Sequence, residues 1–124
     1  MGCTSGRSEV AKTKRLLIVE DEERLRRSVS RYLESHGIEV TQAGSLEEAR
    51  SYLDAGAFDA VVLDVGLPDG DGLALLPLAG VQRAVVVTAN PEPKRFRDCG
   101  VRHHLAKPLD LRELHWTVEA LQPA

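Results

Sequence analysis

The sequence Asp-Ala-Val-Val-Leu-Asp, residues 59–64, is the clearest indication of the fold class. Its apolar residues are continuous rather than alternating, which predicts a strand that is buried on both faces of a sheet. Residues 15–19 and 84–88 have a similar pattern, because each contains a run of branched apolar side chains that leads up to polar residues. Strands of this kind are typical of parallel sheets with helices on both faces.

Amphipathic segments separate these strands. Leu25, Val29 and Leu33 recur at helical spacing after the first strand, which predicts a helix with one buried face. Residues 45–48, Ser-Leu-Glu-Glu, form a capping box that opens the next helix. Residues 110–113, Asp-Leu-Arg-Glu, have the same form and open the last helix.

Strand and helix alternate five times along the chain. Weaker strands are expected at residues 38–43 and 103–106, and Pro77 and Pro93 are expected to shorten the third and fourth helices, with Pro77 curtailing the third. Short connections and right-handed crossovers then predict an α/β fold with a doubly wound, five-stranded parallel sheet. In such sheets ligands bind beyond the carboxyl ends of the strands.

Length and composition predict one domain, at residues 15–122, preceded by a flexible polar tail at residues 1–14. No apolar run is long enough to cross a membrane. The formal net charge of −3 gives no overall field that would favour nucleic acid. The two cysteines, Cys3 and Cys99, form no disulfide framework, so we expect a reducing cytoplasm as the setting.

Polar side chains gather at the expected carboxyl ends of four strands. Glu20 and Asp21 follow the first strand, Asp64 ends the third, Thr88 ends the fourth and Lys107 follows the fifth. Three carboxylates at one edge repel one another unless a cation neutralises them, and Mg²⁺ prefers such oxygen ligands. A carboxylate held in this way can attack phosphorus while an ammonium and a hydroxyl neutralise the phosphoryl oxygens.

Four motifs resemble, in the family's order, the signatures of response-regulator receiver domains, and the resemblance covers about residues 14–122. The motifs are residues 19–22 (Val-Glu-Asp-Glu), 63–70 (Leu-Asp-Val-Gly-Leu-Pro-Asp-Gly), 87–89 (Val-Thr-Ala) and 106–109 (Ala-Lys-Pro-Leu). One motif alone would be weak, but four that each end an expected strand make a specific match. The resemblance implies a flavodoxin-like (βα)5 fold and a phosphorylatable switch of a two-component system.

The resemblance also implies a role for each site residue. Asp64 would be the phosphoacceptor, and Lys107 would pair with the phosphoryl group. Asp21 would bind Mg²⁺ directly and Glu20 through a water, while the main-chain carbonyl of Gly66 would complete the protein ligands. The donor would be a histidine kinase or a phosphotransfer protein. We therefore expect no turnover enzyme, only self-catalysed acceptance and hydrolysis of the phosphoryl group.

Thr88 would move toward the phosphoryl group and relay the change to a protein-binding face. The family usually has Tyr or Phe as the second switch residue, three positions before the lysine, and His104 stands there in this chain. The remaining residues are too few for an output domain, so we expect a stand-alone receiver with an unknown downstream protein partner. A homodimer is left open, because the shortened helices alter the face that the family uses for dimers.

Two rival functions are open. A pseudo-receiver would keep the fold and bind a partner without phosphorylation, which His104 and the shortened helices favour slightly. A phosphatase of the haloacid-dehalogenase type would also use a strand-end aspartate, but it needs a second acid where this chain has Gly66.

Other conspicuous residues have plainer interpretations. We interpret Asp69, Asp71 and Asp110 as helix caps or turn residues. Cys99 is expected to be a small buried residue, and the arginines of the first helix are expected to form a solvated face, with contact to the kinase as the alternative. Trp116 falls off the apolar face of the last helix and either packs at its edge or marks a partner surface.

Overall fold

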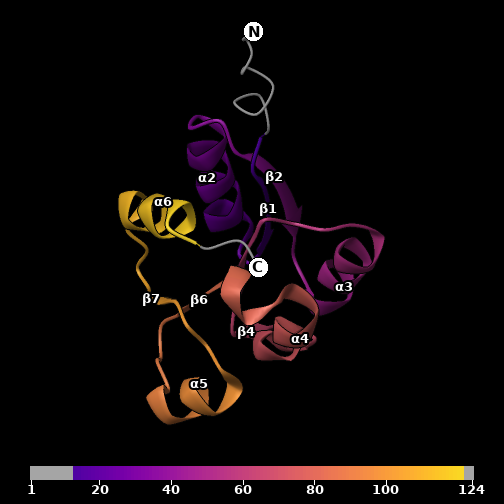
Figure 1. Ribbon diagram of the computed structural model, residues 1–124, viewed down its shortest axis with the longest axis vertical. Coiled ribbons are helices and arrows are strands. Elements are labelled where there is room, and N and C mark those ends of the chain that lie inside the picture. The colour runs from indigo at the N-terminus through magenta and orange to yellow at the C-terminus, as the bar shows by residue number, and fades with distance from the viewer. Residues whose placement is uncertain (1–12, 122–124) are drawn as a thin grey trace, which may run out of the picture.

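The computed structural model describes residues 13–121, so most of the tail expected at residues 1–14 lies outside the described residues. Within this range, five strands form one parallel sheet in the order β2-β1-β3-β6-β7, which confirms the predicted fold class (Figure 1). The strands are β1 (Arg15–Val19), β2 (Glu39–Ala43), β3 (Ala60–Asp64), β6 (Ala84–Thr88) and β7 (His104–Ala106). The strand order reverses between β1 and β3, and their carboxyl ends form one edge.

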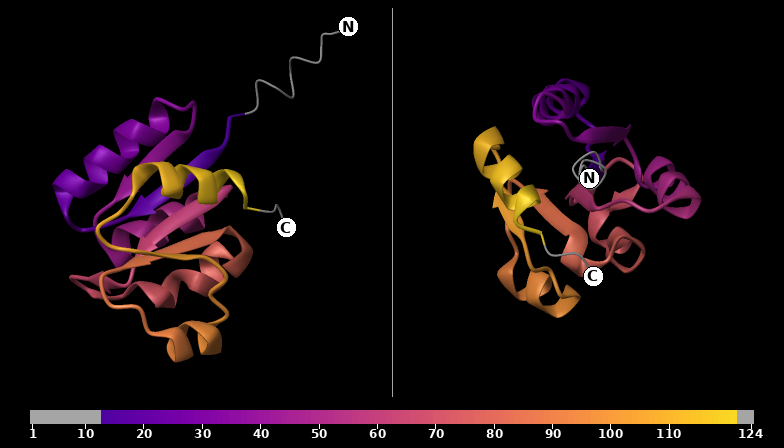
Figure 2. Two further views of the ribbon diagram at one scale, coloured as in Figure 1. Left: turned by 90° about the vertical axis from the view of Figure 1, so that its left-hand side faces the viewer. Right: turned by 45° about the horizontal axis from the view of Figure 1, so that its top comes forward.

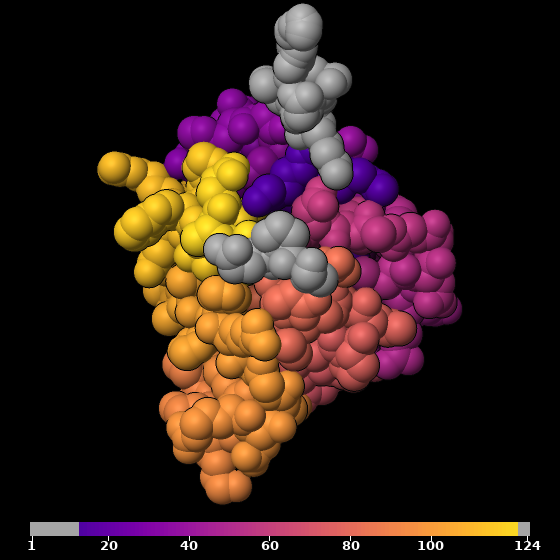
Figure 3. Space-filling model, in the orientation of Figure 1, coloured from indigo at the N-terminus to yellow at the C-terminus, as the bar shows by residue number. Residues whose placement is uncertain are grey.

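Helices cover both faces of this sheet. They are α2 (Glu23–Glu34), α3 (Leu46–Ala55), α4 (Leu76–Ala79), α5 (Pro93–Cys99) and α6 (Leu111–Glu119). Side chains from alternate positions of the strands pack against α2 and α6 on one face and against α3, α4 and α5 on the other. The left view of Figure 2 looks onto the face that α2 and α6 cover, and α5 forms one end of the molecule in Figure 3.

The buried strands explain why the apolar runs were continuous. Every residue of β3 and of β6 is buried, so each face of these central strands contributes to a separate core cluster. None of the helices in residues 13–121 is long and apolar enough to cross a bilayer.

The capping residues identified in the sequence have their expected partners. The Ser45 hydroxyl accepts a hydrogen bond from the amide of Glu48, and the Glu48 carboxylate accepts one from the amide of Gly44. The Asp110 carboxylate accepts hydrogen bonds from the amides of Arg112 and Glu113 at the start of α6. These bonds satisfy amides at and just before the helix starts, which no helical carbonyl can reach.

Two local predictions were wrong. Pro77 does not curtail the third helix but lies in the first turn of α4, where the missing N–H costs nothing, and the helix ends at Gly80 with φ of 89°. A 3₁₀ turn, η1 (Gly72–Leu75), leads directly into α4. Cys99 is exposed rather than buried, because it ends the short helix α5.

A small hairpin follows the central strand where the sequence indicated only a turn-rich loop. Its strands are β4 (Gly66–Leu67) and β5 (Gly70–Asp71), and the amide of Gly72 donates to the carbonyl of Val65 at 2.7 Å. A Cβ at Gly72 would overlap the carbonyl oxygen of Asp64. The hairpin therefore packs against the backbone of the strand end, and only glycine fits at its close.

Candidate functional site

The candidate site lies at the carboxyl edge of the sheet, where four parallel strands end side by side. Asp64 lies opposite Val87 in the β3–β6 ladder, and Thr88 lies opposite Ala106 in the β6–β7 ladder. The chain continues from Ala106 directly into Lys107, whose amide donates to the carbonyl of Thr88 at 2.9 Å. The sheet register thus brings together residues that are far apart in sequence.

Three carboxylates form a compact acidic cluster at this edge. Carboxylate oxygens of Glu20, Asp21 and Asp64 all lie within 4.8 Å of one another. Glu20 is 4% exposed and Asp64 8%, whereas Asp21 is exposed. Backbone amides hold the two buried groups, because the amide of Glu22 donates to Glu20 and that of Gly66 donates to Asp64. The donor set is all oxygen and opens to solvent at Asp21, which fits a hard divalent cation that keeps part of its water.

Lys107 is the cation that faces this cluster. Its Nζ lies 2.9 Å from Oε1 of Glu20 and 3.2 Å from Oδ2 of Asp64. The peptide bond between Lys107 and Pro108 is cis. The three carboxylates and the single ammonium leave a formal charge of −2 at the site.

Burial and the contact between Glu20 and Lys107 act in opposite directions on the pKa of each of these two groups. Burial raises the pKa of Glu20 above 4.5, although the hydrogen bond from Lys107 acts in the opposite direction. Burial alone would lower the pKa of Lys107, but the hydrogen bonds and charges of Glu20 and Asp64 together raise it. The two carboxylates therefore favour the charged form of Lys107, whereas burial disfavours the charged form of Glu20.

The two residues expected to form the switch lie in different environments. Thr88 is 6% exposed, and its hydroxyl accepts a hydrogen bond from the amide of Asn90 at 3.1 Å. His104 is exposed, and its ring lies edge-on to Phe96 of α5 with centroids 5.2 Å apart. His104 thus connects the edge strand β7 with α5, on the side of the sheet that carries α3 and α4.

The aspartates interpreted as caps have structural roles. Asp69 of the hairpin accepts hydrogen bonds from the amides of Leu46 and Glu47, at the start of α3. These bonds lower its pKa. Asp71 accepts from the amide of Leu73 and also forms an ion pair with Arg95 of α5.

Arg26 is a residue of this edge that the sequence-based prediction missed. It was grouped with the solvated arginines of the first helix, but it is partly buried and donates to the main-chain carbonyl of Glu20 at 2.9 Å. Its position three residues before the buried Val29 places it near the buried face of α2, and that spacing is the signal in the sequence that could have found it.

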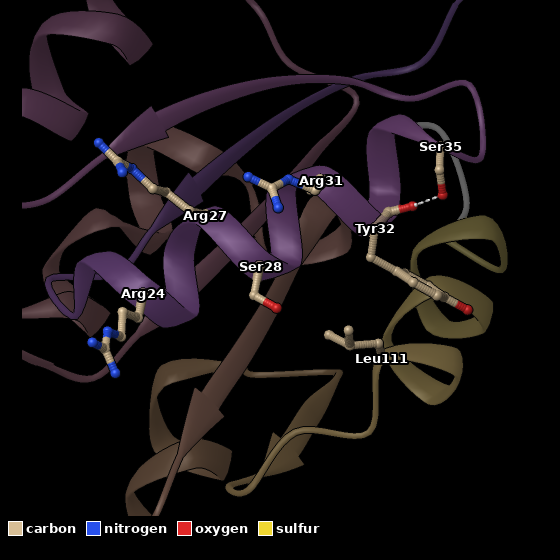
Figure 4. Close-up of a pocket in the computed structure, with 7 residues that line it drawn as sticks. All are labelled: Arg24, Arg27, Ser28, Arg31, Tyr32, Ser35 and Leu111. Carbon is tan, nitrogen blue, oxygen red and sulfur yellow. Dashed lines mark hydrogen bonds between the residues drawn. The ribbon is translucent and has the colours of Figure 1, made fainter.

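The other arginines of α2 line an open groove. The groove has a volume of about 490 Å³ and lies between α2 and the start of α6. Its lining residues are Arg24, Arg27, Ser28, Arg31, Tyr32, Ser35 and Leu111 (Figure 4). Arg27 pairs with Glu23, whereas Arg24 and Arg31 form no ion pair with any other residue in the 13–121 range. Figure 4 shows Tyr32 and Leu111 extending into the same space from the two helices.

Comparison with known proteins identifies the family. The model of the response regulator receiver domain matches residues 16–119. The chain belongs to the response-regulator receiver domain family. The receiver domain is 36% identical over 114 residues to the transcriptional regulatory protein PmrA of Pectobacterium parmentieri, a match that covers 86% of this chain and 51% of PmrA. It spans about half the length of the curated relatives that it matches first.

Solved receiver structures have the same architecture. A CheY-like receiver domain protein from Methanospirillum hungatei matches with a TM-score of 0.79 and 27% identity, over 87% of this chain and 92% of that one. A response regulator protein from Burkholderia pseudomallei, solved with a phosphorylated aspartic acid, a calcium ion and citrate, matches with a TM-score of 0.76 and 29% identity. This match covers 88% of this chain and 66% of that one.

Proposed function

We propose that this receiver domain is a phosphorylatable switch in which Asp64 accepts a phosphoryl group from a histidine kinase or a phosphotransfer protein, with Mg²⁺ as cofactor. The observation that carries the proposal is the convergence of three carboxylates and the Lys107 ammonium at one sheet edge. An isolated strand-end aspartate would be a cap or a turn residue, but Asp64 shares its edge with the groups that phosphoryl transfer needs.

The residues of the edge suit the cofactor. Asp21 and Asp64, with the main-chain carbonyl of Gly66, would hold Mg²⁺, and Glu20 would contact it through a water. Bound there, Mg²⁺ supplies positive charge that aligns and neutralises the oxygens of the transferred phosphoryl group. Its charge of +2 matches the formal −2 that the carboxylates and Lys107 leave uncompensated.

The protein groups then carry out the transfer. A carboxylate oxygen of Asp64 forms a bond to phosphorus as the bond between phosphorus and the donor imidazole nitrogen breaks, and that nitrogen keeps the electron pair. Lys107, whose Nζ lies 3.2 Å from Asp64, pairs with one phosphoryl oxygen. The Thr88 hydroxyl turns toward another and donates to it, because its proton is free while the hydroxyl oxygen accepts from the amide of Asn90. That movement would pass the change through the end of the sheet to a protein-binding face.

The donor protein would dock in the arginine-lined groove. The helix α2 begins two residues after Asp21, so a partner held along it lies beside the acidic edge. Arg24 and Arg31, which form no ion pair within the described part of the chain, offer charge, and Tyr32 and Leu111 offer apolar contact area.

The phosphorylated aspartic acid of the Burkholderia structure supports the proposed chemistry by similarity.

We also propose that the domain has no steady phosphatase turnover on external phosphate esters. The position two residues after the nucleophile is Gly66, which has no side chain to shuttle a proton. The second candidate function is a pseudo-receiver that binds its partner without phosphorylation. The exposed His104, in the place of the usual aromatic switch residue, favours it.

Acetyl phosphate and Mg²⁺ test the proposal without a kinase. We expect intact-protein mass spectrometry to detect one added phosphoryl group on the wild type, stable in acid and labile in base. Asp64→Asn should not be labelled, whereas Asp54→Asn, which removes an exposed carboxylate from α3, should be labelled normally. An unlabelled wild type that binds Mg²⁺ would favour the pseudo-receiver, and continuous release of phosphate from many esters would favour an enzyme.

A further inference from the structure

Arg26 joins three segments that meet behind the acidic cluster. Its Nη1 donates to the main-chain carbonyl of Glu20 at 2.9 Å, just past the end of β1. Its Nε donates to the side-chain oxygen of Gln42 on β2 at 3.1 Å. The backbone of Arg26 belongs to the first turns of α2, where its amide donates to the carbonyl of Glu22. One guanidinium therefore ties the helix to two neighbouring strands.

The carbonyl that Arg26 holds is part of the peptide that connects Glu20 with Asp21. The amide on the other side of Glu20 donates to the carbonyl of Ala43 at 3.0 Å. Both main-chain polar groups of Glu20 are thus fixed. Because this planar peptide also carries the Cα of Asp21, the bond from Arg26 constrains the position from which this exposed carboxylate leaves the backbone.

The space for this guanidinium is closely limited. A Cβ placed on Gly44 would lie 3.1 Å from Nη1 of Arg26 and 3.9 Å from its Cζ. Glycine at the end of β2 therefore leaves the guanidinium in place, and an alanine would displace it by a few tenths of an ångström. Gly44 has no left-handed backbone conformation, so its alanine variant tests contact rather than backbone strain.

We propose that Arg26 is a positioning residue of the metal site: it orients the Glu20–Asp21 peptide so that both acids face Asp64, and its loss weakens the binding of a divalent cation. The inference rests on the proposed function, because it assumes that the cation binds at this cluster. Among the described residues, Arg26 forms no hydrogen bond or ion pair with a carboxylate of the cluster, so it acts through the backbone. Partners of this indirect kind change metal affinity by about ten- to hundredfold when they are removed.

Mg²⁺ binding measured by calorimetry on four variants tests the inference. Arg26→Met removes both hydrogen bonds, Arg26→Lys retains the charge but not the forked donors, and Gly44→Ala displaces the guanidinium. Arg97→Met is the control, because Arg97 is an exposed arginine on α5. We expect Arg26→Met to raise the Mg²⁺ dissociation constant about tenfold or more, the other two site variants to raise it less, and the control to match the wild type.

A second readout separates positioning from stability. With acetyl phosphate as donor, the Mg²⁺ concentration for half-maximal labelling should rise in Arg26→Met, while the labelling rate at saturating Mg²⁺ stays within about twofold. If Arg26→Met only lowers the melting temperature in EDTA and binds Mg²⁺ as the wild type does, Arg26 is merely structural and the inference is overturned. If the wild type itself binds no Mg²⁺, the proposed function fails. That outcome differs from the one in which the wild type and Arg26→Met bind Mg²⁺ equally well, which overturns only the role of Arg26.

Discussion

Neutralising Asp64, the proposed phosphoacceptor, should stabilise the metal-free receiver domain. Asp64→Asn removes one charge from an edge where three carboxylates face a single ammonium. Breaking a buried ion pair usually destabilises a protein, because the remaining charge loses its partner. Here Lys107 keeps Glu20 at 2.9 Å, and the formal charge of the site falls from −2 to −1.

The distances give the size of the competing effects. At an effective dielectric constant of about 20, the Lys107–Asp64 pair at 3.2 Å attracts by about 5 kcal/mol. The repulsion between Glu20 and Asp64, at no more than 4.8 Å, is at least about 3.5 kcal/mol by the same measure. These two terms largely cancel, so the desolvation of a buried carboxylate, several kcal/mol, decides the sign. We expect Asp64→Asn to gain about 1–2 kcal/mol, or about 4–8 °C in Tm.

Thermal unfolding followed by circular dichroism in EDTA measures this gain. Asp54→Asn makes the same change in net charge on an exposed site and should leave Tm within about 2 °C. Adding Mg²⁺ at ten times its dissociation constant should stabilise the wild type by about 1.4 kcal/mol and Asp64→Asn by far less. A lower Tm for Asp64→Asn in EDTA would show that the attraction to Lys107 dominates, and the reasoning from excess charge would be wrong.

Three further predictions concern separate parts of the domain. Because burial raises the pKa of Glu20, the stability that this residue contributes is present below pH 4.5 and is lost as pH rises through its folded-state pKa. In EDTA, the wild type should therefore lose stability relative to Glu20→Gln between pH 4.5 and neutrality. A difference that stays constant with pH in denaturant titrations would contradict this. Reversing the charge of the groove with Arg24→Glu and Arg31→Glu should slow phosphorylation by a phosphohistidine protein about tenfold or more. The same variants should be labelled by acetyl phosphate at the wild-type rate, and equal slowing with both donors would place the defect at Asp64. Gly72→Ala should destabilise the fold by about 1–3 kcal/mol, because the added methyl group would overlap the Asp64 carbonyl. Urea titrations measure this loss, and an unchanged unfolding midpoint would show that the hairpin moves freely.

The sheet could be predicted because its signal is local in sequence. A continuous apolar run such as residues 60–63 can be buried on both faces only in a helix-covered sheet, and the alternation with helices then determines the topology. The same logic predicted the edge, since parallel strands end together. It placed Asp64 and Lys107 side by side although they are 43 residues apart.

Features that depend on contacts between distant segments could not be predicted. The amphipathic pattern of α2 separates apolar from charged residues, but it does not show that Arg26 reaches a carbonyl at the end of β1. Proline is found both after helix ends and in first turns, and the local sequence does not distinguish the two positions. Pro77 was therefore expected to end a helix, whereas it lies in the first turn of α4. The exposure of Cys99 depends on how short α5 is and on which of its residues meets the core, and only Phe96 is buried there.

The charge balance of the edge also predicts how Thr88 should respond to the proposed phosphorylation. With Mg²⁺ bound, the carboxylates, Lys107 and the metal are formally neutral. An aspartyl phosphate would carry up to about two negative charges where Asp64 carried one, so the buried edge would again hold excess negative charge. The Thr88 hydroxyl is a buried donor at this edge whose proton is not needed for its bond with Asn90, in which it accepts. We therefore expect Thr88 to turn toward the phosphoryl oxygens for an electrostatic reason, whether or not His104 follows it.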